Sequence, residues 1–418
     1  MRSRWNLAFL LLCCAPLLAQ SDSGYVTSTV TQYSLAPDLL VKAHALYTVR
    51  TTLHFLETLW GILVLIGILR FRIGPRLRDF AEGSTRFRFV QALIFVPIIT
   101  LLIDVLALPF GIYGQQLSLR YGLSIQRWGS WFWDWTKGEM IGLAVGALLI
   151  WLLYVVIRRS PKRWWFYAWL GVMPILVLVI WAVPVVLNPL FNKFEPLAKD
   201  HMDLVQATQK IASVSGVDVP TDRMFLMKAS EKVTTANAYV TGVGSTKRVV
   251  VWDTTTKQLN VPQTTFVIGH EMGHYVLHHI DKGLAFAAVM LFFGFWLTYR
   301  IFLWAVARWG HGWQIRDAAD WASFPALMLI ASLLGFVAEP IGNTFSRHIE
   351  HEADAYGLQI TSQITPDYKE VAAQSFQSLG EHSLAYPYPN KLMVVWLYNH
   401  PDISSRVQYA LQYEPGQK

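Results

Sequence analysis

The sequence predicts a mainly α-helical, polytopic membrane protein that carries one water-soluble domain, and three observations support this prediction. Hydrophobic residues make up 53% of the 418 residues and aromatic residues 14%. Charged residues make up only 15%, against about 25% in soluble domains. Six apolar stretches each approach the ~20 residues that a spanning helix needs. They occupy residues 53–70, 89–112, 140–157, 164–187, 284–306 and 321–340. This composition excludes a disordered chain and disfavours an ordinary soluble one.

Residues 1–21 allow two interpretations. Arg2 and Arg4 precede an apolar run, Leu7 to Ala19, that is too short to cross ~30 Å of hydrocarbon. A basic start, a short apolar run and small residues near its end are typical of a signal peptide. The alternative is a short, uncleaved first transmembrane helix.

The distribution of charge predicts how the chain lies in the membrane. Arginine and lysine gather in the loops at 70–88 and 158–163, which the positive-inside rule assigns to the cytoplasm. Residues 22–52 and 188–283 then lie on the opposite side. The net charge of +7 comes largely from such loops, so it predicts membrane lipid and no nucleic acid as a partner.

The chain therefore divides into residues 22–187, an N-terminal transmembrane region, and residues 188–418, a domain interrupted by a helix pair at about 284–340. Residues 199–214 have the periodicity of an amphipathic helix. Arg248–Trp252 and Asn237–Thr241 are predicted strands. Gly242 and Gly244 suit a turn between them.

One motif carries recognisable chemistry. Residues 267–276 contain His270, Glu271 and His274 in the pattern HExxH. On a helix the two imidazoles share a face and can bind one zinc ion, with Glu271 beside them as general base. The only two cysteines, Cys13 and Cys14, lie in the N-terminal apolar run, so the remaining metal ligand must be a histidine or a carboxylate.

The segment 346–354 offers candidates for the third ligand. Glu350 and Asp354 are four residues apart, on one face of a helix. Glu350 could bind the metal, and Asp354 could accept a hydrogen bond from a ligand histidine and fix its orientation. A solvated acidic face is the alternative. His348, His351 and Glu352 fall on other faces and are interpreted as structural or exposed. His278 and His279 are expected to continue the helix after His274 in a structural role.

Taken together, the motifs resemble those of one known family. The stretches 188–197, 237–239, 247–254, 270–274 and 346–354, followed by His400-Pro401 and Arg406, are similar to the type I CAAX prenyl proteases, which are integral-membrane zinc metalloproteases. The resemblance is strong from residue 188 onward and looser over 22–187. It implies a ring of six to seven transmembrane helices, the seventh being residues 4–20, around a wet chamber. An α+β, gluzincin-like zinc metallopeptidase domain closes this chamber.

The resemblance also implies roles for individual residues. His270, His274 and Glu350 would hold one Zn²⁺ per chain, with Glu271 as the catalytic base and Asp354 as the acid that orients a ligand. Asn237, Ala238 and Tyr239 would form an edge strand that pairs with the substrate backbone. His400 and Arg406 would lie near the cleft, where a cationic side chain could stabilise an oxyanion.

Two classes of function follow. The first is a membrane zinc endopeptidase that acts on a peptide or protein substrate, including a lipid-modified one. The second is a non-enzymatic transporter or chaperone with an inactive site, for which the intramembrane charge of Asp104 is the best observation. The loop charges predict an extracytoplasmic catalytic domain, at the inner membrane if the host is a Gram-negative bacterium. Exported or membrane-associated polypeptides then become plausible substrates.

Overall fold

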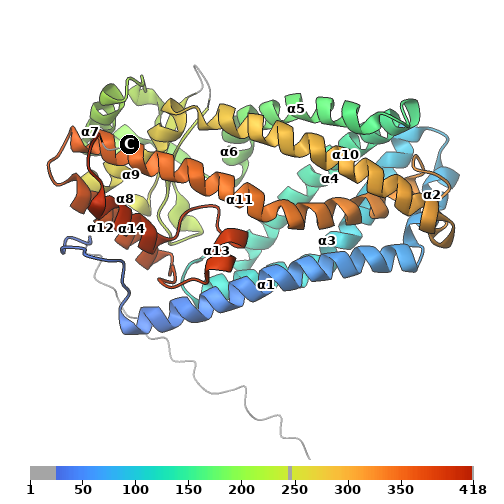
Figure 1. The fold of residues 1–418 in the computed structure, drawn as a ribbon, viewed down its shortest axis with the longest axis horizontal. Helices are drawn as coiled ribbons and strands as arrows, with labels where there is room; N and C mark the ends of the chain where they lie inside the picture. Colours follow the sequence, from blue (N-terminus) through green and yellow to red (C-terminus); the bar gives the residue numbers. More distant parts are fainter. Residues whose placement is uncertain (1–24, 243–246, 417–418) are drawn as a thin grey trace, which may run out of the picture.

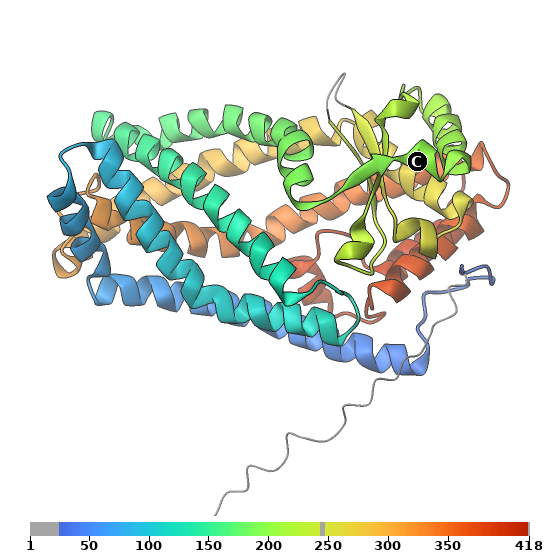
Figure 2. The same cartoon turned by 180° about the vertical axis from the view of Figure 1, so that it is seen from behind.

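The computed structural model describes residues 25–242 and 247–416 and has an elongated shape (Figure 1). Long helices run along the longest axis, and a small sheet with its covering helices forms one end (Figure 2). The predicted signal peptide or first span, residues 1–21, and Gly244 of the predicted turn lie outside the described residues.

All six predicted spans are confirmed by helices that are long and apolar enough to cross a membrane. Five of the six helices extend beyond the apolar stretch predicted for them, because hydrophobicity marks only the length that lies in lipid. These helices are α1 (Pro37–Arg70), α3 (Arg88–Arg120), α4 (Trp128–Arg159), α5 (Trp164–Ala182), α10 (His279–Trp313) and α11 (Phe324–Ser362). Helix α5 continues through a π-helical turn, Val183–Leu187, into α6 (Asn188–Phe191).

The six helices contact one another in turn and close a ring, α1–α3–α4–α5–α10–α11 and back to α1. In the most apolar window of each of the first five spans, only 6–17% of the residues are buried. A helix in a packed bundle buries a continuous apolar stripe, so these helices make only limited contact with one another. A seventh helix is not required to close the ring among the described residues.

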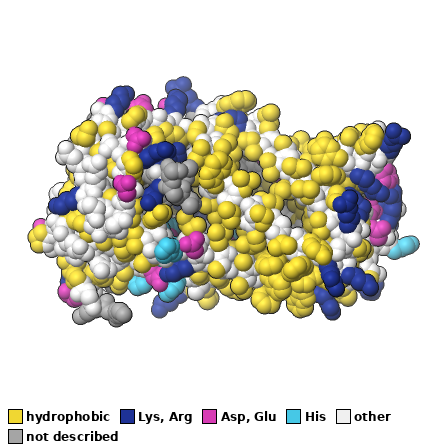
Figure 3. All heavy atoms as spheres, turned by 90° about the horizontal axis from the view of Figure 1, so that it is seen from above, with side chains coloured by type: hydrophobic (Ala, Val, Ile, Leu, Met, Phe, Trp, Pro, Cys, Tyr) yellow, Lys and Arg dark blue, Asp and Glu magenta, His cyan; other side chains and the backbone are white. Residues whose placement is uncertain are grey.

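Polar side chains of neighbouring spans contact one another, as expected for spans that border a wet interior. His54 of α1 and Glu339 of α11 approach to 3.1 Å, and Asp104 of α3 is hydrogen-bonded to Glu139 of α4. Charged groups at membrane depth face a bundle interior or a water-filled cavity. On the outside, hydrophobic side chains dominate the middle of the surface, which is hollowed within this band (Figure 3).

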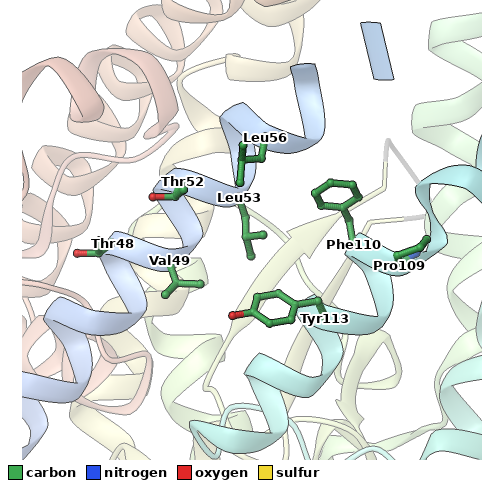
Figure 4. Close-up of a pocket in the computed structure, with 8 residues that line it drawn as sticks. All are labelled: Thr48, Val49, Thr52, Leu53, Leu56, Pro109, Phe110 and Tyr113. Carbon is green, nitrogen blue, oxygen red and sulfur yellow. The ribbon is translucent and has the colours of Figure 1, made fainter. Parts of the chain in front are cut away.

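An apolar groove of about 480 Å³ separates part of α1 from α3. Leu53, Phe110 and Tyr113 project into the space between the two helices (Figure 4). The lining residues are Thr48, Val49, Thr52, Leu53, Leu56, Pro109, Phe110 and Tyr113. The ring is therefore loosely packed along this seam.

The end of the ring opposite the sheet carries α2 (Ile73–Ser84), a helix that the sequence analysis did not predict in the first basic loop. Arg78 of α2 donates to Asp320 at 2.6 Å and to the Gln314 carbonyl at 3.0 Å. This buried ion pair ties α2 to the link between α10 and α11. The two basic loops thus lie at the same end of the molecule, where lysine and arginine side chains gather (Figure 3).

The other end is the α+β domain. Its sheet has the order β1-β2-β4-β3, with β2 and β4 parallel and the other pairs antiparallel. The strands are β1 (Phe194–Pro196), β2 (Met224–Met227), β3 (Ala238–Thr241) and β4 (Arg248–Trp252). The helices of this end are α7 (Met202–Val214), α8 (Thr255–Gln258), α9 (Val261–Val276), α12 (Tyr368–His382), α13 (Lys391–Leu397) and α14 (Ile403–Gln412). The predicted helix at 199–214 and both predicted strands are confirmed, whereas β1 and β2 were missed.

Helices α9 and α11 cross at very short range inside the core of this domain. A Cβ atom on Gly357 would lie 3.1 Å from the backbone nitrogen of His270 and 3.2 Å from its Cα. A Cβ atom on Gly273 would lie 3.1 Å from the Cβ of Tyr356. Backbone atoms cannot move aside as a flexible side chain can, so the crossing requires glycine.

We predict that Gly357→Ala destabilises the protein. Overpacking at a backbone contact costs about 1–3 kcal/mol, which outweighs the ~1 kcal/mol that alanine gains over glycine within a helix. The matched control is Gly342→Ala on the same helix, where nothing lies within 4 Å of the added methyl group. Melting temperatures in detergent should fall for Gly357→Ala only; equal melting temperatures for the two variants would contradict the tight crossing.

Candidate metal centre and cavity

Helix α9 presents the HExxH residues from a rigid, buried position. Its first turn is closed by a capping box between Asn260 and Gln263, and Phe266 and Met272 are fully buried in the core. His270 and His274 extend from the same face, with 3.2 Å between their Nε2 atoms. The periodicity argument for a shared face is therefore confirmed.

Helix α11 brings a carboxylate to both imidazoles. Glu350 Oε2 lies 3.3 Å from His270 Nε2, and Glu350 Oε1 lies 3.5 Å from His274 Nε2. Glu271 is farther away, with 4.0 Å between its carboxylate and His270 Nε2. Glu350 is 7% exposed, so the solvated acidic face that was the alternative for this residue is wrong.

These donors fit a metal ion. One ligand atom each of His270, Glu271 and His274 lies within 4.8 Å of the other two. Bonds of 2.0–2.2 Å place tetrahedral zinc donors about 3.3 Å apart, close to the separations between Glu350 and the two histidines. The Oε2 atom of Glu350 is buried without a hydrogen-bond donor among the described residues. An unpaired buried carboxylate oxygen is costly, and a cation would satisfy it.

Asp354 and Arg406 support His270 from behind. Asp354 Oδ1 lies 2.8 Å from His270 Nδ1, and Asp354 is 1% exposed. Arg406 binds Asp354 through two nitrogens, at 2.9 and 2.6 Å. Burial lowers the pKa of His270, but its interactions with the carboxylates of Asp354 and Glu350 outweigh burial and raise this pKa to about 9. His270 is therefore held strongly in its orientation toward Glu350.

Beyond His274 the structure differs from the sequence-based expectation. Helix α9 ends at Val276, and His278 takes the left-handed conformation with φ 57°. The chain thus leaves α9 at a turn and begins α10 at His279. His279 becomes buried, with its Nδ1 2.9 Å from His274 Nδ1 and its Nε2 3.0 Å from Glu352. Glu352, which was interpreted as structural or exposed, thus contacts the buried ring of His279.

Glu271 faces a small cavity of about 100 Å³. Burial raises the pKa of its carboxyl group, His270 and His274 partly offset this rise, and the backbone of Val240 hydrogen-bonds to it. Asn237, His400 and Arg406 line the same cavity together with His270. Three of the four candidate catalytic residues, Glu271, His400 and Arg406, therefore line one cavity.

The three residues of the candidate substrate strand differ in position. β3 lies at the edge of the sheet, as expected. Asn237 lines the cavity, and Ala238 is buried. The Tyr239 side chain lines a different pocket, with Trp252 and Asn188.

His400 reaches the site from the segment after α13. Its Nε2 lies 3.4 Å from Glu350 Oε2, and its side chain is 52% exposed. Arg347 of α11 holds this segment by donating to the carbonyl oxygens of Val394 and Tyr398, at 2.8 and 2.6 Å. No sequence pattern predicts the contacts of Arg347, because they join segments that are distant in the chain.

The remaining histidines of α11 stay outside the centre, as expected. His348 is largely exposed, with its Nε2 3.7 Å from Glu352. His351 stacks on Tyr409, with 4.3 Å between ring centroids.

Comparison with known proteins agrees with this geometry. Residues 198–414 match the model of peptidase family M48, and residues 26–193 match that of the CAAX prenyl protease N-terminal region, described as five membrane helices. The chain is 31% identical to the uncharacterized metalloprotease YhfN of Bacillus subtilis, over 91% of this chain and 87% of that protein. It is 25% identical to CAAX prenyl protease 1 of Saccharomyces cerevisiae, over 78% and 73% of the two chains.

The fold has a counterpart among solved structures. The crystal structure of S. mikatae Ste24p matches with a TM-score of 0.78 and 21% identity, over 91% of this chain and 90% of that one. Nothing in these matches supports the transporter or chaperone alternative. The chain belongs to peptidase family M48 and is a membrane-embedded zinc metalloprotease related to the CAAX prenyl proteases.

Proposed function

We propose that His270, His274 and Glu350 hold one zinc ion per chain and that Glu271 is the general base of an endopeptidase. The observation that carries this proposal is the meeting of two imidazoles with a buried carboxylate that has one unpaired oxygen. Glu271 lies beside them, and it lines a cavity together with His270. Two nitrogen donors and one oxygen donor suit zinc and leave a position open for chemistry.

When bound, zinc makes a water molecule more acidic and polarises a carbonyl group. Glu271 takes a proton from the attacking water and delivers it to the leaving amine. Its raised pKa suits a group that must both accept and return a proton near neutral pH. His400, which is half-exposed at the cavity, is the side chain best placed to contact the carbonyl oxygen of the scissile bond. Arg406 is occupied by Asp354, so we assign it a positioning role.

The substrate is proposed to align along the open edge of β3. The backbone N–H of Trp252 donates to the backbone carbonyl of Asn237 at 3.0 Å. Along an antiparallel strand the N–H and C=O groups of successive residues point alternately to one side and the other. The backbone N–H and C=O groups of Ala238 and Val240 therefore point away from β4. The contact between Val240 and Glu271 places this edge beside the general base. An extended peptide added here would bring its backbone to the cavity.

We infer that the catalytic end is extracytoplasmic. The arginines of α2 and of the link between α4 and α5 lie at the opposite end of the ring, and such basic loops stay in the cytoplasm. Prenylation occurs in the cytosol, so exported or membrane-associated polypeptides are the substrates we propose. A lipid-modified peptide is the second candidate, favoured by the apolar groove between α1 and α3.

His270→Ala and Glu271→Gln should separate metal binding from catalysis. We expect His270→Ala to lose zinc, because one of three donors is removed. Glu271→Gln should retain zinc while hydrolysis falls by at least ~10²-fold, the scale of general-base catalysis. The measurement is zinc content together with cleavage of matched farnesylated and unmodified peptides by purified protein in detergent.

The matched control is His351→Ala, an exposed histidine beside Glu350, which should retain zinc and activity. Equal cleavage by wild type and Glu271→Gln would refute the role of Glu271. Preference for the unmodified peptide would support exported polypeptides as substrates, and preference for the farnesylated peptide would support the second candidate.

Asp354→Asn should weaken zinc binding or the turnover rate by ~10–100-fold, the usual cost of removing a carboxylate behind a ligand histidine. The amide cannot accept from His270 and pair with Arg406 in the way that the carboxylate does. Chelator competition measures the affinity. Unchanged affinity and rate would leave Asp354 with a purely structural role.

A reporter fused after Lys418 should behave as extracytoplasmic. The matched control is the same reporter fused after Ser160, between α4 and α5, which should report the cytoplasm. Enzymatic reporters of the two compartments in the same host make the measurement. A cytoplasmic signal from the fusion after Lys418 would reverse the proposed orientation.

A further inference from the structure

We propose that His279 and Glu352 form a positioning relay that orients His274 toward the metal, an inference that rests on the proposed role of His274 as a zinc ligand. From the sequence alone, both residues are expected to lie outside the metal site, in structural or exposed positions. Three contacts in series support the relay: His274 to His279, His279 to Glu352, and Glu352 to Lys282.

The turn after α9 makes the first contact possible. Leu277 donates its N–H to the Gly273 carbonyl at 2.9 Å, and His278 then adopts φ 57°. This conformation costs a non-glycine residue roughly 1–2 kcal/mol. It starts α10 at once and folds the His279 ring onto His274, with 5.0 Å between ring centroids. The His279 side chain is only 2% exposed.

The distances fix which nitrogens carry hydrogen. His274 Nε2 faces His270 and Glu350, so its lone pair is the one available to a metal and the hydrogen is on Nδ1. Two Nδ1 atoms at 2.9 Å attract only if one donates and the other accepts. His279 Nδ1 therefore accepts, and its Nε2 carries the hydrogen that is donated to Glu352 Oε2 at 3.0 Å.

Lys282 completes the relay by donating to the same carboxylate oxygen at 2.7 Å. The arrangement parallels the one behind His270, where a carboxylate and a cation, Asp354 and Arg406, act directly. An imidazole is needed on the His274 side because Glu352 follows Glu350 by two residues. Two residues turn a helix by about 200°, so Glu352 cannot reach His274 itself.

The alternative is that His279 is only a buried histidine whose two nitrogens are satisfied. The two accounts differ in their effect on the metal. A hydrogen-bond acceptor behind a ligand histidine fixes the ring and raises its basicity, and its loss costs 10–100-fold in metal affinity. A merely structural histidine would change stability and leave the affinity of the folded protein unchanged.

The test uses zinc affinity of the full-length protein in detergent, measured by chelator competition, and the absorption spectrum of the cobalt-loaded protein. His279→Leu removes the acceptor, and we expect its zinc dissociation constant to rise ~10–100-fold with a changed cobalt spectrum. His279→Asn keeps an amide oxygen near the position of Nδ1 and should restore most of the affinity. Glu352→Gln, altered at a partly exposed site, should show a smaller loss.

The matched control is His311→Ala, an exposed histidine near the other end of α10. It should bind zinc as the wild type does. Melting temperatures of the metal-free proteins identify any variant that fails to fold. If His279→Leu does not fold, the zinc affinities of His279→Asn and Glu352→Gln are compared instead.

His274→Ala separates the two levels of inference. Loss of zinc in His274→Ala with unchanged affinity in His279→Leu and Glu352→Gln would overturn the relay and leave the proposed metal centre standing. Retention of zinc in His274→Ala would overturn the metal centre itself.

Discussion

The close crossing of α9 and α11 is the constraint on which the rest of the site depends. Gly273 and Gly357 let the two helix backbones approach without intervening side chains. At that distance His270 reaches Glu350 on one side of its ring and Asp354 on the other. A wider crossing would separate the donors by more than a metal ion can bridge, since tetrahedral zinc requires donors about 3.3 Å apart.

Continuity of the helices couples this crossing to the membrane ring. Helix α11 begins at the end of the ring near α2 and continues without interruption to Ser362, so Glu350 is held by a helix anchored at the far end by the Arg78–Asp320 pair. Helix α10 starts at His279, directly after the turn that follows the metal helix. The positions of the metal donors are therefore set by elements that also form the wall of the ring.

The features of this arrangement that could be predicted from sequence are those that depend on residues close together in the chain. Helical periodicity places His270 with His274 and Glu350 with Asp354, since each pair lies within one turn. The spans were found because lipid demands long apolar runs, but their ends were not, since α11 becomes polar beyond residue 340 and stays helical. β1 and β2 were missed because strands of three or four residues carry too little pattern.

The role of His279 could not be predicted for a different reason. The expectation that it continues the helix assumed regular geometry, and a single residue in the left-handed conformation, His278, separates α9 from α10. The identity of His278 is only a weak signal, because glycine and asparagine usually adopt this conformation, although histidine is enriched among the other residues that do. The contacts from His279 to His274 and Glu352 require this turn. Their formation stabilises the turn and offsets the strain at His278. The strained backbone of His278 and the orientation of His274 therefore depend on the same contacts of His279. This explains why a strained residue directly follows the helix that carries the candidate metal ligands.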